Sequence, residues 1–185
     1  MELRVNLAIL AALGLVWAAL AAGQPVAALD PASVRTRRLA DLEDGFARNR
    51  DDRATALALA ESYLEIHEPG LAIATLRSAD PQLLEDPMVS HRLAQAYEQS
   101  GRVLDALATA DVAIARCARS IGADGATVLT PVPRFECTEG TYAALEMHRA
   151  ALDRMVRWGV SDPERDPRAR IAYDVAVRRA RVASF

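Results

Sequence analysis

HRLAQAYEQSGRVLDALATADVAIA, residues 91–115, has the pattern of a helix, a turn and a second helix. Its apolar and small residues recur at intervals of three and four on both sides of Gly101, as they do on the buried face of an amphipathic helix. Glycine readily adopts the left-handed backbone conformation that ends a helix. The stretch therefore predicts a helix–turn–helix unit with its turn at Gly101.

The same pattern occurs once more, earlier in the chain, at residues 57–79. One constant shift relates five pairs of identical residues: Leu59 and Leu93, Ala60 and Ala94, Tyr63 and Tyr97, Ala72 and Ala106, Ala79 and Ala113. Such a shift, a period of about 34 residues with a helix–turn–helix in each unit, is the signature of the tetratricopeptide repeat (TPR). The segments LALAESYLEIHEPGLAIATLRSA and HRLAQAYEQSGRVLDALATADVA resemble this family.

The resemblance implies an all-α fold, a TPR-like α-solenoid with clear units at about residues 53–86 and 87–120 within a repeat region of residues 30–120. The residues that pack these units would be Leu59, Ala60, Tyr63, Ala72, Leu93, Ala94, Tyr97 and Ala106. The chain departs from the family pattern in two ways. Ala56 and Ser90 stand where a tryptophan is expected early in each unit, and the closing proline sits early, at Pro81, in the first unit and is absent from the second.

Other helices are predicted on both sides of the repeats. A helix at 32–48 would be half of a preceding unit, and a Gly- and Pro-rich insert loop at 121–140 separates the repeats from a helix pair at 141–185. This pair, with helices at about 141–158 and 167–183, would cap the stack, and a divergent third unit is the alternative. Ile171, Val175 and Val182 would share the apolar side of the last helix. Asp-Pro pairs at Asp30, Asp86 and Asp166 are typical of helix starts.

The N-terminal segment, 1–29, is predicted to be a signal peptide or a membrane anchor. Arg4 is followed by no charged residue until Asp30, and the dense apolar part extends from Val5 to Gly23. The small residues before Gln24 suit a cleavage site. An uncleaved N-terminal apolar helix of this length could instead span a bilayer, which takes about 17–25 residues. We expect an exported protein, periplasmic or membrane-anchored in the cell envelope.

Cys117 and Cys137 are the only cysteines of the chain. An even number in an exported protein predicts a disulfide, and this one would close a loop of about twenty residues, worth about 3 kcal/mol in the chain-entropy model. Two free thiols are the alternative in a reducing compartment. A metal site is a weaker alternative, because no histidine stands at a matching ligand spacing.

Composition and motifs favour binding over catalysis. The formal net charge of −3 lacks the basic excess of nucleic-acid-binding proteins. The chain contains no G-x-S-x-G, no phosphate-binding glycine loop and no H-E-x-x-H. His67, His91 and His148 have no partner at metal-ligand spacing in the sequence. We therefore predict a protein that is not an enzyme and has no catalytic residue, no metal and no cofactor.

The resemblance also implies a binding surface. In this family, residues of each unit's first helix that are not used for packing face the inside of the curved stack. The candidate partner-binding residues are Leu57, Glu61, Leu64, Glu65, His91, Gln95, Glu98 and Gln99. This mixed apolar and acidic surface suits an extended or helical peptide with basic residues. A solvated face, or a face covered by the chain's own C-terminal helices, are the alternatives.

The sequence thus predicts an adaptor or scaffold that binds another protein through its TPR-like helices, in a multiprotein assembly of the cell envelope. The alternative is a permanently assembled structural subunit of a membrane complex, anchored by its N-terminal helix. The arginine-rich last helix could also lie on an anionic membrane, although a packed helix with a solvated charged face is the commoner situation.

Overall fold

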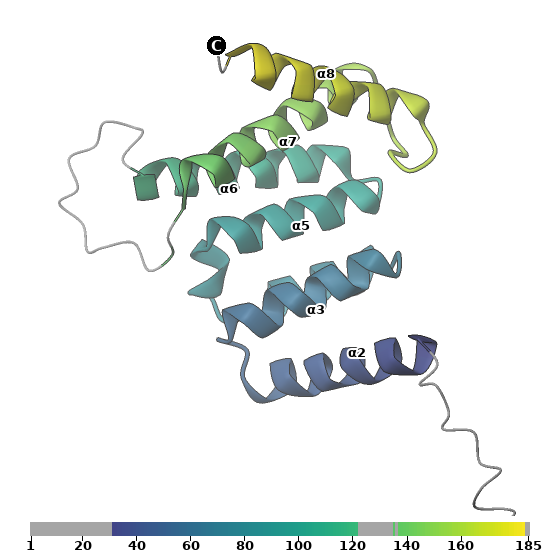
Figure 1. Ribbon diagram of the computed structural model, residues 1–185, viewed down its shortest axis with the longest axis vertical. Helices are drawn as coiled ribbons and strands as arrows, with labels where there is room; N and C mark the ends of the chain where they lie inside the picture. Colours follow the sequence, from purple (N-terminus) through teal and green to yellow (C-terminus); the bar gives the residue numbers. More distant parts are fainter. Residues whose placement is uncertain (1–30, 122–134, 136, 184–185) are drawn as a thin grey trace, which may run out of the picture. The chain divides into compact units, whose positions relative to one another are not determined.

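The computed structural model describes residues 31–121, 135 and 137–183 (Figure 1). In these residues the regular elements are all helical: α2 (Pro31–Arg48), α3 (Arg53–Glu65), α4 (Pro69–Ser78), the 3₁₀ helix η1 (Leu83–Glu85), α5 (Pro87–Gln99), α6 (Val103–Ile121), α7 (Glu139–Arg157) and α8 (Pro167–Ala183). For the described residues the prediction of an all-α fold is confirmed. The predicted signal or anchor at 1–29 lies outside the described residues, as does most of the predicted insert.

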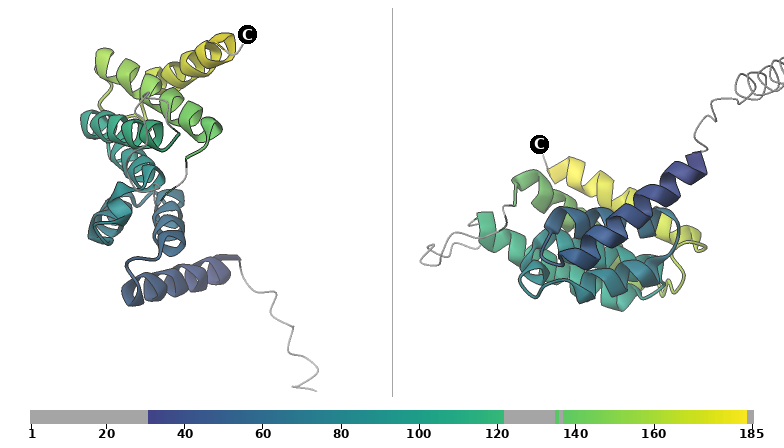
Figure 2. Two further views of the ribbon diagram at one scale, coloured as in Figure 1. Left: turned by 90° about the vertical axis from the view of Figure 1, so that its left-hand side faces the viewer. Right: turned by 90° about the horizontal axis from the view of Figure 1, so that it is seen from below.

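The chain divides into two compact units, residues 1–40 and 41–185. Of the first unit the structure describes the beginning of α2, where the side chains of residues 32–38 are exposed. In the second unit each helix from α3 to α8 packs against the next one along the chain, and α3 also contacts α5. Figure 2 shows this succession of helices from two further sides.

Aspartates begin three of the helices in the same way. The side chains of Asp52, Asp86 and Asp166 accept hydrogen bonds from the backbone N–H two residues further on, at 3.1, 2.7 and 2.9 Å. A carboxylate in this place satisfies a free donor of the first turn, and a following proline has no N–H to leave unpaired. The predicted starts at Asp86 and Asp166 are therefore found, whereas Asp30 lies outside the described residues.

One hydrogen-bond pattern ends α3, α5 and α7. A residue with positive φ follows each helix: His67 (58°), Gly101 (77°) and Gly159 (65°). The next N–H donates to the carbonyl five residues earlier, in Glu68 to Tyr63, Arg102 to Tyr97 and Val160 to Met155, at 2.8–2.9 Å. This is the Schellman arrangement, which satisfies carbonyls that the helix end leaves free. The predicted turn at Gly101 is therefore found, and it is one of three helix ends with this arrangement.

Small residues and two tyrosines fill the space between the helices of α3–α6. Ala60, Ala72, Ala94 and Ala106 are fully buried, Leu59 is buried, Leu93 is half-buried, and Tyr63 and Tyr97 are each 7% exposed. The hydroxyl of Tyr63 donates to Glu43 at 2.7 Å, and burial together with this carboxylate raises the pKa of Tyr63 to about 12. Ala56 and Ser90 are themselves buried, so a tryptophan at either place would need space that neighbouring side chains occupy.

The last helix buries a face that we did not predict. Ala169, Ala172 and Ala176 are buried in the main core, whereas Ile171 is 49% exposed and Val175 is half-buried. The side chain of Val182 lies outside the described residues. The expectation that Ile171 belongs to the packing face is wrong, because close approach of two helices requires small side chains at the contact and not the most apolar ones.

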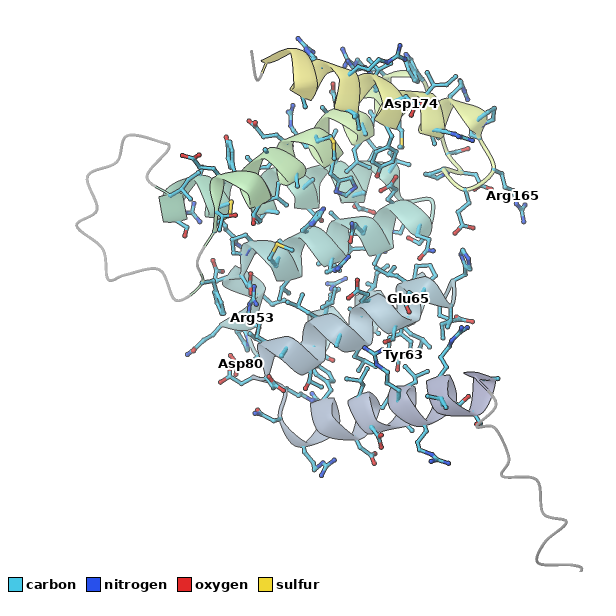
Figure 3. The ribbon with its side chains drawn as sticks, in the orientation of Figure 1. Arg53, Tyr63, Glu65, Asp80, Arg165 and Asp174 are labelled. Atoms are coloured by element: carbon cyan, nitrogen blue, oxygen red, sulfur yellow. A yellow bond between two sulfur atoms is a disulfide. The ribbon has the colours of Figure 1, made fainter. Side chains whose placement is uncertain are left out.

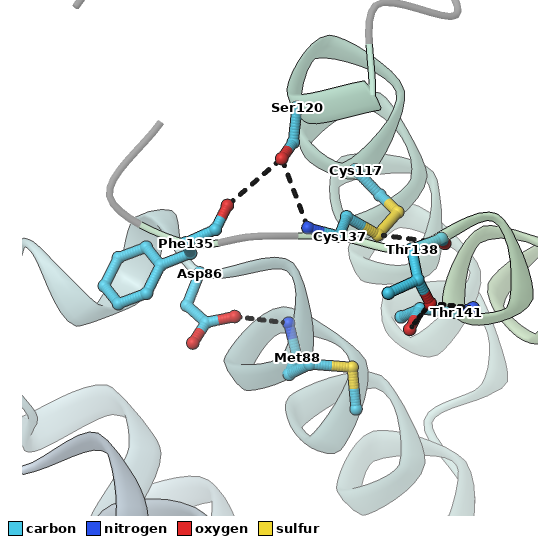
Figure 4. Close-up of a disulfide and its surroundings, with 8 residues drawn as sticks. All are labelled: Asp86, Met88, Cys117, Ser120, Phe135, Cys137, Thr138 and Thr141. Carbon is cyan, nitrogen blue, oxygen red and sulfur yellow. Dashed lines mark hydrogen bonds between the residues drawn. A yellow bond between two sulfur atoms is a disulfide. The ribbon is translucent and has the colours of Figure 1, made fainter. Parts of the chain in front are cut away.

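The predicted disulfide is present and joins the end of α6 to the start of α7 (Figure 4). Cys117 is fully buried, and its Cα lies 5.3 Å from that of Cys137. Ser120 reinforces the connection, because its hydroxyl donates to the Phe135 carbonyl at 3.1 Å and accepts from the Cys137 N–H at 3.2 Å. The ends of the predicted insert are therefore held in place, and helix α7 begins at Glu139, slightly earlier than expected.

Candidate functional site

A pocket of about 460 Å³ opens between α3, α5 and the chain that leads into α8. We call it the α3–α5 groove. Its lining residues are Glu61, Leu64 and Glu65 of α3, Arg92, Gln95, Glu98 and Gln99 of α5, and Pro163, Glu164 and Tyr173 of the C-terminal pair. Six of the eight predicted partner-binding residues thus lie together. Leu57, half-buried on α3, and His91, turned against His148 of α7, do not line the groove.

The charges of the groove are mostly acidic. Among the described residues that line it, Arg92 has the one guanidinium, which donates to Glu61 at 2.8 Å and to Gln95 at 2.9 Å. Glu65, labelled in Figure 3, has no ion-pair partner in the described chain. With Glu98 and Glu164, four carboxylates face a single arginine. This distribution of charge favours cationic over anionic ligands.

His67 lies between two groups of the groove rim. Its Nδ1 is 3.2 Å from a carboxylate oxygen of Glu164 and 3.1 Å from the side-chain nitrogen of Gln99, which also donates to the Leu64 carbonyl. An imidazole nitrogen accepts when it is bare and donates when it carries a proton. His67 therefore accepts from Gln99 when Nδ1 is bare and donates to Glu164 when Nδ1 carries a proton.

A polar cluster joins α5, α7 and α8 at the wall of the groove. Both carboxylate oxygens of Glu98 accept from the Tyr173 hydroxyl, at 2.9 and 2.7 Å, and one also accepts from Nε2 of His148 at 2.8 Å. The side chains of Glu98 and His148 are 13% and 5% exposed. In this low-dielectric setting such bonds are stronger than in water and hold the carboxylate in one orientation.

His91 completes the cluster on the buried side. Its ring meets the ring of His148 edge to face, with the centroids 5.0 Å apart. Burial, and then the positive charges that His148 and Arg92 can carry, lower the pKa of His91 to about 4. His91 is therefore neutral at physiological pH and packs, half-buried, against the His148 ring.

The protonated phenol of Tyr173 is better suited to hydrogen bonding than to acid–base or nucleophilic chemistry. Burial and the Glu98 carboxylate raise the pKa of Tyr173, so its phenol stays protonated and is a poor base or nucleophile. Within the described residues no group of three or more His, Cys, Asp or Glu side chains is placed to hold a metal ion. No helix in the described part of the chain has the length and apolarity needed to cross a membrane.

The sequence did not reveal this cluster. Glu98 and His148 are 50 residues apart, and Glu98 and Tyr173 are 75 apart. Helical periodicity reports which side of its own helix a residue occupies, and not which distant residue it meets. Only the packing of the C-terminal pair against α5 and α6 brings these side chains together.

Comparison of the chain with protein-family models, with characterised proteins and with solved structures finds no significant match.

Proposed function

We propose that this chain is a non-enzymatic protein-interaction adaptor whose α3–α6 segment forms two TPR-like repeats. Support comes from structural features that recur at the interval seen in the sequence: the caps at Asp52 and Asp86, the left-handed residues His67 and Gly101, and the buried rings of Tyr63 and Tyr97. The α7–α8 pair repeats the turn but not the spacing. It would be a divergent terminal unit that closes a short α-solenoid.

The observation that carries the proposal is the α3–α5 groove. Its acidic side chains lie beside the apolar surfaces of Leu64, Pro163 and Tyr173. A partner segment with basic and apolar residues would find both charge complementarity and apolar contact there. The C-terminal pair supplies one wall of the groove, so a bound segment would touch the repeats and the terminal unit together.

The state of the groove's reactive groups supports the proposal of binding over catalysis. Glu98 already accepts hydrogen bonds from Tyr173 and His148, and Tyr173 holds its proton. Tyr173 is therefore not poised to take or give a proton at neutral pH. The Glu98 carboxylate supplies a fixed negative charge, which contributes to recognition of a cation.

Removal of charge from the groove tests the proposal. The double variant Glu65→Gln, Glu164→Gln should lose partners that co-purify with the wild-type protein from its native extract at low salt. The matched control Glu68→Gln, Asp174→Asn removes the same charge from exposed residues outside the groove and should keep them. Circular dichroism would establish that both variants are folded. Equal retention of partners by both variants would contradict a role for the groove.

We also propose that the protein is exported and acts in the cell envelope. The Cys117–Cys137 disulfide supports this, because such bonds persist in oxidising compartments. Intact mass without reductant, together with membrane fractionation, tests the proposal. A soluble chain starting at Gln24 with its disulfide intact would favour a secreted adaptor, and a full-length chain in the membrane would favour an anchored subunit. A full-length, reduced chain in the cytoplasm would contradict export.

A further inference from the structure

The rings of two histidines are in edge-to-face contact where the C-terminal pair meets α5. His91 belongs to α5 and His148 to α7, and Glu98 and Tyr173 connect the same junction to α8. The junction positions Tyr173, which lines the groove. Whatever loosens these contacts must therefore alter the groove wall.

The proton positions at His148 follow from its surroundings. Its Nε2 carries a proton, because the Glu98 carboxylate can only accept. Its Nδ1 is buried and has no hydrogen-bond partner in the described chain. A second proton on Nδ1 would create a buried, unpaired N–H on a cation, which costs more than a bare nitrogen. No acceptor in the described chain is placed to bond a proton on Nδ1 of His148.

The surroundings of His91 disfavour its protonated, positively charged form. Its neighbours are the His148 ring on α7 and Arg92 on the same helix, and both disfavour a positive charge. Arg92 is itself paired with Glu61 of α3, and the nearest carboxylate of the cluster, Glu98, already bonds Tyr173 of α8 and His148. No hydrogen bond joins His91 to a carboxylate in the described residues. A charged His91 therefore has no carboxylate partner in the closed junction, and moving the ring into water would stabilise it.

We propose that the His91–His148 contact is an acid-sensitive latch, which holds the α7–α8 wall of the groove against α5 while His91 is neutral and releases it when His91 is protonated. This inference rests on the proposed function where it treats the pocket as a binding groove. Acidification would open the wall and weaken the hold on a bound segment.

The direction of the effect follows from the two protonation equilibria. The pKa of His91 is about 4 in the closed state and would return toward 6.5 once the ring reaches water. The open state therefore binds the proton more tightly. The latch is at full strength above about pH 6.5 and weakens as pH falls toward 4.

Hydrogen exchange on the free, disulfide-intact chain tests the latch without any partner. Rates would be measured between about pH 7.5 and pH 4.5 and divided by the intrinsic rate at each pH. Protection of α8 relative to α3 should fall by up to about seventyfold over this range, the value reached when the open-state pKa of His91 is 6.5. His91→Phe keeps an aromatic ring against His148 but cannot be protonated, so its relative protection should stay constant. A pH-independent ratio in the wild-type protein would overturn the proposal.

Two comparisons separate the latch from other histidine effects. His67→Gln removes the exposed histidine beside Glu164 and should keep the wild-type pH dependence. If His91→Phe does not fold, NMR titration of the wild-type imidazoles decides, because the latch requires His91 to titrate well below 6.5. Titration of His91 near 6.5 would refute it. Failure of the latch leaves the Glu65 and Glu164 experiment unaffected, so the two proposals fail separately.

Discussion

The α3–α6 segment and the α7–α8 pair end their first helices with the same turn but are held together by different contacts. In α3–α6, matching residues of the two units fill matching places, with tyrosines at the helix ends and alanines where helices approach. In α7–α8, Met155 occupies the place of the tyrosines, and Tyr173 and His148 connect the pair to α5 through Glu98. Apolar packing holds both segments, and the α7–α8 pair has in addition a polar cluster of Glu98, His148 and Tyr173 that connects it to α5.

The two kinds of contact differ in whether the sequence reveals them. Repeated packing leaves a period in the sequence, because each unit must satisfy the same neighbours. A polar cluster leaves none, because its members come from different helices. The stability of the apolar segment should depend little on pH, whereas that of the junction should depend on it strongly.

Replacement of Tyr63 or Tyr97 should cause the largest loss in the free energy of unfolding. Tyr97 packs with residues of α6, α7 and α8 in the main core, and Arg102 lies 4.5 Å above its ring. Tyr97→Ala should lower the free energy of unfolding by about 3–5 kcal/mol, and Tyr63→Ala by a similar amount. Urea denaturation measures both, with Tyr97→Phe as a control that keeps the ring. A cost below about 1 kcal/mol would mean that the proposed repeat register is wrong.

Removal of the disulfide should cause the second-largest loss of stability. This loss should mainly affect the C-terminal pair. The bond closes a loop of 20 residues between α6 and α7. Cys117→Ala with Cys137→Ala should cost about 3 kcal/mol in the chain-entropy model. Hydrogen exchange would locate the loss, which we expect in α7 and α8 before α3 and α4. A uniform loss across all helices would mean that the two segments unfold as one unit.

The fold was more predictable than the site for a physical reason. The spacing of Tyr63 and Tyr97, the cap at Asp86 and the turn at Gly101 are local features, and the structure contains each of them. The turn at His67 was not predicted as left-handed, because a residue with a Cβ rarely adopts that conformation. The Glu98 cluster depends on how α7 and α8 pack, which no short stretch of the chain encodes.

The glycines of the two turns should respond differently to an added Cβ. Both have positive φ, but a Cβ at Gly101 would lie 2.9 Å from the Ser161 carbonyl oxygen, whereas Gly159 has no atom within 4 Å of that position. Gly159→Ala should cost about 1 kcal/mol from the left-handed backbone alone, and Gly101→Ala about 2 kcal/mol or more. Gly70→Ala, in the open first turn of α4, is the control and should not destabilise. Equal costs at Gly101 and Gly159 would mean that the α5–α6 turn does not press against the C-terminal pair.

The smallest expected effect is a gain in the free energy of unfolding, whereas the substitutions above should lower it. His67 holds the same left-handed place as Gly101 but has a Cβ, which costs about 1 kcal/mol. Its side chain is 74% exposed, so its contacts with Glu164 and Gln99 stabilise little. His67→Gly should therefore stabilise the chain by about 0.5 kcal/mol, and His67→Ala, which keeps the strain and loses the contacts, should not. If His67→Gly destabilises in thermal unfolding at neutral pH, the rim contacts outweigh the backbone strain. His67 would then belong with the polar junction as a second connection between the repeats and the C-terminal pair.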